Sequence, residues 1–167
     1  MTGLGQVGAA LLLLAMAAGF SVPAYAQIVA LGASNTAGQG VGAAKAFPAQ
    51  VEALLKAAGR PMRVRNAGLS GDTTAGMLAR LDRVTPKGTT IVILQFGGND
   101  RRRGISPTDR QANIDAIIAK LRARGITPVM ADDAVAAGLS RGLRQPDGIH
   151  LTVEGHRQVA ETLLSRM

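Results

Sequence analysis

The stretch IVALGASNTAGQG, residues 28–40, runs from an aliphatic segment into a serine and then into a glycine-rich loop. Ile28–Leu31 has the length and composition of a short buried strand, and Gly32 ends it. Ser34 follows after a single small residue. This pattern predicts a hydroxyl group presented where a strand leaves its sheet, and the rest of the chain decides which kind of sheet that is.

Downstream of this strand, short aliphatic runs alternate with longer amphipathic segments. We expect further strands at 62–66, 90–96 and 126–130, helices at 48–58, 73–84, 107–124 and 153–166, and a short helix within 134–139. Arg63 and Arg65 alternate outward in the second strand, which indicates an edge position. Strict alternation of strands and helices predicts right-handed crossovers and a three-layer α/β/α, flavodoxin-like fold, with a parallel sheet of four or five strands.

The polar and glycine-rich segments of the chain lie beside the same ends of these strands. Ser34 follows the first strand, NAGLSGDT (residues 66–73) ends the second, and GGND (97–100) follows the third. PDGIH (146–150) precedes the last helix. Parallel α/β sheets bind ligands at the carboxyl ends of their strands, so we expect these four loops to meet at one edge of the sheet.

A serine hydroxyl becomes a useful nucleophile beside a general base that a third group orients. The chain has two histidines, and His150 lies three residues after Asp147, with Gly148 between them to permit a tight turn. Such a turn can place the carboxylate against one ring nitrogen and leave the other nitrogen for Ser34. His156 lies inside the last predicted helix, and we expect it at the surface.

Acyl transfer also needs hydrogen-bond donors for the developing oxyanion. The backbone N–H of Ser34 is one candidate, Gly68 would let a peptide N–H approach a substrate closely, and Asn99 offers a side-chain amide. Each of these residues could instead simply form a turn. The evidence for a catalytic role is that their loops converge on one edge of the sheet. Arg101–Arg103 could capture a phosphate or carboxylate at the rim, but a solvated loop is the simpler interpretation.

Metal, thiol and nucleotide chemistry have little support in the sequence. The chain has no cysteine, which excludes disulfides, thiolate zinc sites and a cysteine nucleophile. His150, His156, Asp132 and Asp133 lack the spacing of a metal-ligand set, so we expect neither metal nor cofactor. GQGVGAAKA (38–46) has glycines and a lysine, but no Ser or Thr follows the lysine and the P-loop spacing is absent.

The formal net charge of +8 raises the question of an anionic partner. The basic residues are scattered along the chain, and the one Tyr and three Phe are not interleaved with them. A nucleic-acid interface would need a basic stripe with stacking aromatics. We therefore expect a solvated basic surface and no nucleic-acid partner.

The first 26 residues have the pattern of a secretory signal peptide. The apolar run Val7–Phe20 is too short to cross a bilayer comfortably, and Ala24–Ala26 has the form of a signal-peptidase site. No Lys or Arg precedes the run, so an uncleaved interfacial anchor is the alternative. We expect cleavage after Ala26, a periplasmic or secreted protein without a stable membrane span, and one domain over residues 27–167.

Four blocks of the chain resemble the SGNH (GDSL) hydrolase family: LGASNTAGQG (31–40), NAGLSGDTTAGML (66–78), QFGGNDRRRG (95–104) and DGIHLTVEGH (147–156). The likeness is greatest to the exported bacterial branch of multifunctional thioesterases, lysophospholipases and arylesterases. It implies that Ser34 is the nucleophile and that His150 is the base, oriented by Asp147. It also implies an oxyanion hole formed by Ser34, Gly68 and Asn99, and a small-molecule ester, thioester or lysolipid substrate.

Two departures from the family pattern affect the expected activity. The family's first block usually reads Gly-Asp-Ser-Leu, whereas Ala33 stands here in place of the supporting aspartate. The section between GGND and DGIH is short, which favours an open, shallow site and leaves the fourth strand as an exposed sheet edge. A serine esterase is the leading hypothesis; a carbohydrate acetyl esterase and a catalytically degenerate binding module on the same fold are the alternatives.

Overall fold

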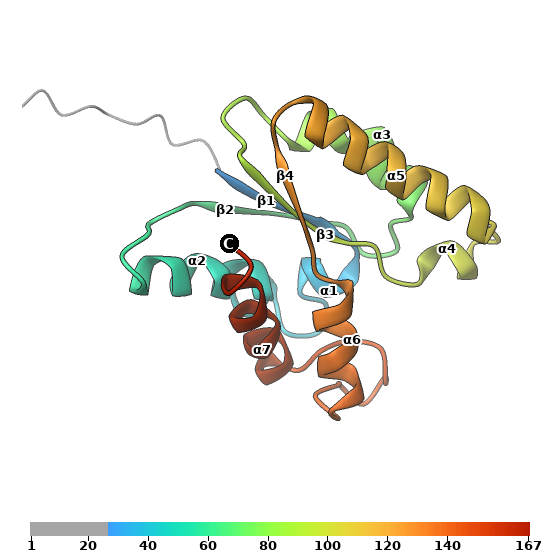
Figure 1. Ribbon diagram of the computed structural model, residues 1–167. Helices are drawn as coiled ribbons and strands as arrows, with labels where there is room; N and C mark the ends of the chain where they lie inside the picture. The colour runs from blue at the N-terminus through green and yellow to red at the C-terminus, as the bar shows by residue number, and fades with distance from the viewer. Residues whose placement is uncertain (1–26) are drawn as a thin grey trace, which may run out of the picture.

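Four short segments form one parallel sheet in the computed structural model, which describes residues 27–167 (Figure 1). The strands are β1 Ile28–Gly32, β2 Val64–Gly68, β3 Ile91–Gln95 and β4 Thr127–Met130. Their order is β2-β1-β3-β4, and each neighbouring pair is parallel. The described sheet thus has β2 and β4 at its edges, as the outward arginines of the second strand and the short third section predicted.

Helices cover both faces of this sheet. They are α1 Ser34–Ala37, the 3₁₀ turn η1 Ala43–Lys45, α2 Phe47–Ala57, α3 Thr74–Val84, α4 Asn99–Arg102, α5 Pro107–Ala123, α6 Asp132–Ser140 and α7 Val153–Leu164. Figure 1 shows α3 and α5 on one face and α2, α6 and α7 on the other. The predicted three-layer α/β/α arrangement is confirmed, with four strands in the described part of the chain.

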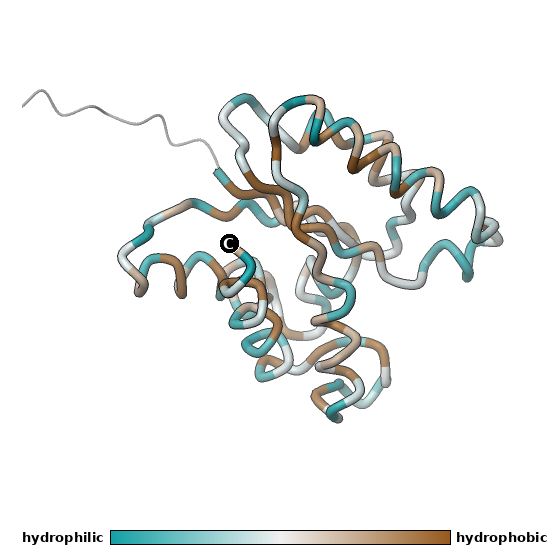
Figure 2. The backbone as a smooth tube through the Cα atoms, viewed as in Figure 1, coloured by the Kyte–Doolittle hydropathy of each residue, from teal (hydrophilic) through white to brown (hydrophobic). Residues whose placement is uncertain are grey.

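The alternation of side chains along β1 joins the two helical layers to the sheet. Ile28 and Ala30 pack in the cluster that contains the buried residues of α2, α6 and α7. Val29 and Leu31 point the other way and pack with the buried residues of α3 and α5. A strand buried on both faces must be apolar at every position, and β1 and β3 are the hydrophobic centre of the tube in Figure 2.

Helix starts follow capping signals that the sequence carries. The hydroxyl groups of Thr73, Ser106 and Thr152 each accept a backbone N–H three residues further on, at the starts of α3, α5 and α7. The segment after β4 forms α6, which extends beyond the predicted 134–139 at both ends. Asp132 and Asp133 occupy its first turn, where carboxylates are favourable.

Two findings bear on membrane attachment. Within residues 27–167, no helix has both the length and the apolar composition needed to cross a bilayer. The predicted signal peptide, residues 1–26, lies outside the described residues.

Candidate active site

Ser34 lies at the point where β1 turns into α1. Gly32 makes this turn possible, because a Cβ atom there would lie 2.1 Å from Thr36 Oγ1 and 2.7 Å from the Gln95 carbonyl oxygen. Ser34 is the first residue of α1, so its N–H belongs to the group of helix-start donors that have no partner within the helix. The turn therefore presents both the hydroxyl and the peptide N–H of Ser34 at the carboxyl edge of the sheet.

His150 and Asp147 reach this edge from the loop that precedes α7. His150 Nε2 lies 2.9 Å from Ser34 Oγ, and His150 Nδ1 lies 2.6 Å from Asp147 Oδ2. The imidazole is 10% exposed, whereas the carboxylate is 44% exposed. A carboxylate can only accept, so Nδ1 carries a proton and the lone pair of Nε2 in the neutral ring faces the serine.

The turn that the sequence predicted between Asp147 and His150 also fixes the carboxylate. Asp147 Oδ1 accepts the N–H groups of Ile149 at 2.9 Å and His150 at 3.0 Å, and Gly148 takes a positive φ of 71°. The hydrogen bond from the His150 side chain, followed by these two N–H groups, lowers the pKa of Asp147 to about 2. The carboxylate therefore stays ionised throughout the range in which an imidazole changes its charge.

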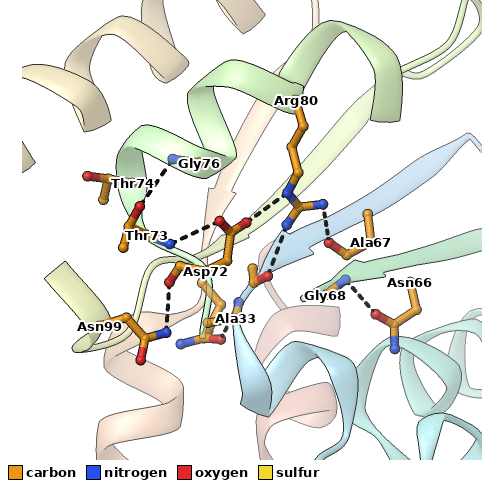
Figure 3. Close-up of polar contacts among 12 residues, drawn as sticks. Ala33, Asn66, Ala67, Gly68, Asp72, Thr73, Thr74, Gly76, Arg80 and Asn99 are labelled. Atoms are coloured by element: carbon orange, nitrogen blue, oxygen red, sulfur yellow. Dashed lines mark hydrogen bonds and ion pairs between the residues drawn. The ribbon is translucent and has the colours of Figure 1, made fainter. Parts of the chain in front are cut away.

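Asn99 is the first residue of α4 and is buried beside the same edge. Its Nδ2 donates to the carbonyl oxygen of Asp72 at 2.7 Å (Figure 3), and its Oδ1 accepts from Arg102. One of the two N–H groups on Nδ2 remains after the Asp72 contact. The side-chain amide of Asn99 is thus held at both ends while it keeps a donor.

A buried ion pair holds the loop that Asn99 contacts. Arg80 Nε lies 2.7 Å from Asp72 Oδ2, and the two side chains are 10% and 7% exposed. The same guanidinium group donates to the carbonyl oxygens of Ala67 and Gly32, at the ends of β2 and β1 (Figure 3). The carboxyl ends of two strands are therefore tied to the Asp72 loop through one side chain.

Gly68 takes a different position from the one that the sequence suggested. Its N–H donates to Asn66 Oδ1 at 2.9 Å (Figure 3), and a Cβ atom there would lie 2.2 Å from the backbone nitrogen of Ala37. This glycine lets α1 pack on the end of β2, and its donor is already occupied. We therefore leave Gly68 out of the set of oxyanion donors.

A cavity of about 340 Å³ opens beside Ser34. Ser34 and Asn99 are among its polar lining residues, and α6 and the His150 loop contribute the apolar lining residues Val135, Ala136, Leu139 and Ile149. Arg102 is the only one of the three consecutive arginines that lines this cavity, although all three are exposed. Arg103 borders a separate hollow beside Gly71.

The predicted position of His156 at the surface is wrong. Its side chain is fully buried, its ring stacks on Phe47 with centroids 6.2 Å apart, and Nδ1 accepts the Phe47 N–H at 3.2 Å. Phe47 begins α2, so His156 caps that helix from the neighbouring helix α7. Nε2 has no hydrogen-bond partner within residues 27–167.

Asp132 and Asp133, whose spacing did not fit a metal site, also have structural partners. Asp132 accepts the N–H groups of Phe96 and Gly97 at 2.9 Å each, which shapes the loop before Asn99. Asp133 pairs with Arg166. No group of three or more His, Cys, Asp or Glu side chains suited to a metal ion occurs among residues 27–167.

The polar side chains that hold α1 in place were not predicted from the sequence. Gln95 Oε1 accepts from Ala33 N at 3.3 Å and from Thr36 Oγ1 at 3.1 Å. Asn35 bonds to the His150 loop, and Asn66 Nδ2 donates to the Thr36 carbonyl oxygen at 2.8 Å. The only signal for these roles was the presence of amide residues in three of the resembling blocks.

Comparison with known proteins identifies a matching family and relatives that are named as esterases. A family model described as the GDSL-like Lipase/Acylhydrolase family matches residues 30–143. Esterase TesA of Pseudomonas aeruginosa is 35% identical over 99 residues, which cover 59% of this chain and 49% of that protein. The arylesterase of Vibrio mimicus is 31% identical over 105 residues, which cover 62% of this chain and 52% of the relative. The chain thus spans about half the length of these curated relatives.

Two solved structures also resemble the fold of this chain. The crystal structure of TesA is 26% identical with a TM-score of 0.72, and the match covers 83% of this chain and 96% of that one. The SGNH-hydrolase family esterase AlinE4 is 31% identical with a TM-score of 0.58, covering 83% of this chain and 70% of AlinE4. Because the family match extends over more than half of its residues, this chain belongs to the GDSL-like lipase/acylhydrolase family.

Proposed function

We propose that this chain hydrolyses carboxylic esters or thioesters through a covalent acyl-enzyme, with Ser34 as nucleophile, His150 as general base and Asp147 as the group that orients it. The observation that carries the proposal is the hydrogen-bonded series from Asp147 through His150 to Ser34, at 2.6 and 2.9 Å. These are hydrogen-bonding distances for a nucleophile, its base and an orienting carboxylate.

In the proposed first half-reaction, Ser34 Oγ attacks the carbonyl carbon and its proton passes to His150 Nε2. The imidazolium that forms is stabilised by Asp147, whose low pKa keeps it ionised. The tetrahedral intermediate collapses when His150 gives its proton to the leaving alcohol or thiol. In the second half-reaction, His150 deprotonates a water molecule, which attacks the acyl-enzyme, releases the acid and restores Ser34.

The oxyanion of each tetrahedral intermediate needs donors that are fixed before the reaction. We assign this role to the N–H of Ser34 and the second N–H of the Asn99 side chain. Gly71, in the loop after β2, replaces Gly68 as the candidate for a third oxyanion donor. Its φ is 80°, and its N–H has no hydrogen-bond partner within the described residues. Gly71 directly precedes Asp72, the residue that Asn99 contacts.

The cavity indicates the class of acyl group. Its volume of about 340 Å³ lies near the lower end of the range of roughly 300–1,000 Å³ for small-molecule pockets. One wall is apolar, from Val135, Ala136 and Leu139, so short and medium aliphatic acyl groups should bind better than long ones. The names of the relatives, which include an arylesterase and a thioesterase/lysophospholipase, support aryl esters, thioesters and lysolipids as substrates to test.

A fluorophosphonate probe and a series of p-nitrophenyl esters test the proposal together. Wild-type protein should be labelled and should release p-nitrophenol with an acyl-length optimum between acetyl and octanoyl. Ser34→Ala should abolish both signals, and His150→Ala should reduce both at least 100-fold. Labelling that persists in Ser34→Ala would reject the nucleophile assignment.

The same series separates the two alternatives. A carbohydrate acetyl esterase would use acetyl esters almost exclusively, so the ratio of acetyl to octanoyl turnover distinguishes it from a general esterase. A catalytically degenerate binding module, which Ala33 and the short third section suggest, would show no turnover that depends on His150. Turnover that is lost in both Ser34→Ala and His150→Ala would exclude the binding module.

We further propose that residues 1–26 are a signal peptide and that residues 27–167 act as one exported domain in the periplasm or outside the cell. The apolar run and the Ala-x-Ala sequence before Gln27 support this assignment. Expression of the full chain in a Gram-negative host followed by N-terminal sequencing of the periplasmic fraction tests it. A protein that begins at Gln27 is expected, and a full-length protein in the cytoplasmic fraction would contradict export.

A further inference from the structure

We propose that Asn35 is a positioning residue for the reaction, because its side-chain amide fixes the backbone on both sides of His150. This inference rests on the proposed function, in which His150 is the base for Ser34. It concerns a residue that follows the nucleophile directly in the sequence and that does not itself contact the reacting atoms.

The two hydrogen bonds of Asn35 bracket the histidine. Its Oδ1 accepts the N–H of Leu151 at 2.9 Å, and its Nδ2 donates to the carbonyl oxygen of Ile149 at 3.4 Å. Leu151 and Ile149 are the residues immediately after and before His150. One planar group therefore restrains the chain on both sides of the imidazole.

This contact joins two parts of the site that are far apart in the sequence. Asn35 is 114 residues from Ile149 and 116 from Leu151, it belongs to α1 with Ser34, and it is 7% exposed. Any movement of the His150 loop relative to α1 must break a buried hydrogen bond. The Ser34 Oγ to His150 Nε2 distance is therefore coupled to the Asn35 amide.

The other hydrogen bonds of the His150 loop do not make a buried connection to α1. Asp147 and the 2.7 Å bond from Gln145 N to the His150 carbonyl oxygen hold the shape of the loop itself. The Gln145 side chain makes a second tie to the α1 side, through the Gln39 carbonyl oxygen, but that contact is exposed. Asn35 makes the buried tie beside the reacting atoms.

The geometry requires a carboxamide at this position. One oxygen must accept from an N–H while one nitrogen donates to a carbonyl, and only Asn has both groups on so short a side chain. Asn35→Asp keeps the acceptor for Leu151 but sets a second oxygen against the Ile149 carbonyl oxygen. Asn35→Ala removes both bonds.

A double-mutant cycle with His150→Ala tests whether Asn35 acts through the histidine. With p-nitrophenyl butyrate, Asn35→Ala should lower kcat about 10- to 100-fold with KM changed less than threefold, the size expected for a displacement of about 1 Å. Asn35→Asp should fall between wild type and Asn35→Ala. In the His150→Ala background, Asn35→Ala should cause no further loss of the residual kcat.

Asn66→Ala is the matched control. Asn66 also uses its amide to accept one N–H and to donate to one carbonyl oxygen, and it also restrains α1. Within the described residues it makes no hydrogen bond to the His150 loop. It should lower the midpoint of urea unfolding about as much as Asn35→Ala while kcat changes less than threefold. An equal loss of kcat in both asparagine variants would show a merely structural role and overturn the proposal.

The outcomes distinguish this inference from the proposed function. If His150→Ala retains only a small residual kcat and Asn35→Ala lowers kcat by the same factor with and without His150, the esterase stands and the role of Asn35 is rejected. If His150→Ala keeps the wild-type kcat, the proposed function fails and the Asn35 assignment fails with it. Circular dichroism of each variant confirms that the fold is retained before kinetics are compared.

Discussion

Protonation of His156 should destabilise the domain in acid, by an amount that can be worked out from its burial. Desolvation, with a smaller contribution from the charge of His150, lowers the pKa of His156 from 6.5 to about 4. The unfolded chain binds a proton at this histidine below pH 6.5, whereas the folded chain binds that proton only below about pH 4. The unfolded state thus holds more protons in this window, so stability rises with pH and is complete above pH 6.5.

The linkage relation gives the size of the effect. Between pH 7 and pH 4.5, a shift of this magnitude removes about 2.5 kcal/mol from the free energy of unfolding. Asp147 does not interfere, because its own contribution is lost only as the pH falls from the ordinary pKa of 3.8 to the folded pKa of about 2, below this window. Within residues 27–167 the Nε2 N–H of His156 is buried without a hydrogen-bond partner. A second proton would have to bind at Nδ1 and displace the hydrogen bond from the Phe47 N–H, so protonation favours opening of the fold.

Urea denaturation followed by far-ultraviolet circular dichroism measures this dependence, since the chain has no tryptophan. His156→Gln is the reference variant, because glutamine does not titrate and its side-chain oxygen can still accept the Phe47 N–H. Wild type should lose about 2.5 kcal/mol more than His156→Gln between pH 7 and pH 4.5. Equal losses in the two proteins would refute the argument.

Three further changes have expected outcomes. Arg80→Met leaves the buried carboxylate of Asp72 without its partner and should lower the free energy of unfolding in urea by about 3 kcal/mol; a loss below about 1 kcal/mol would contradict the role of this pair. Gly68→Ala brings a methyl group to 2.2 Å from the α1 backbone and should lower the free energy of unfolding by at least about 2 kcal/mol. Gly98→Ala is the control, because its methyl group meets open space and should change the free energy of unfolding by less than about 0.5 kcal/mol. Urea midpoints that shift equally in the two variants would refute the packing argument. Asp147→Asn should lower kcat/KM for p-nitrophenyl butyrate about 10³-fold with little change in the urea midpoint, and a loss below tenfold would mean that His150 is oriented by other groups.

The layers of the fold could be predicted from the sequence because burial on both faces leaves a clear pattern. β3, Ile91–Gln95, is aliphatic at four successive positions, which a half-exposed strand cannot be. Helices were recognisable by their caps and inner stripes. The short helices α1 and α4 were missed because each has four residues, too few for a helical period to show, and both are held by tertiary contacts.

The error on His156 could have been avoided with the same kind of argument. Its position in α7 places it three, four and seven residues before Val159, Ala160 and Leu163, all of which are buried. Helical spacing puts these residues on one face, so the histidine lies on the inner stripe of α7. The residue type suggested the surface, but the period of the helix was the stronger signal.

The contacts of Gly68 were unexpected for a different reason. A glycine at a strand end can free its N–H for a ligand or let another segment pack closely, and the sequence does not distinguish these two uses. The decisive fact is the proximity of α1, which is a contact between segments about 30 residues apart. Such a contact depends on the folded arrangement and leaves no local pattern.

Ala33 shows how the nucleophile turn can be held without the aspartate that the family usually carries there. The N–H of Ala33 bonds to Gln95, which also receives the Thr36 hydroxyl, so β3 restrains both ends of the turn. Asn66 restrains α1 from β2, and Asn35 restrains it from the His150 loop. An isolated helix of four residues has no stability of its own, so α1 is held in place by its contacts with these three amides. The nucleophile turn is therefore held without a carboxylate at position 33: Gln95 restrains the turn itself, Asn35 aligns α1 with the His150 loop, and Asn66 adds to the stability of α1.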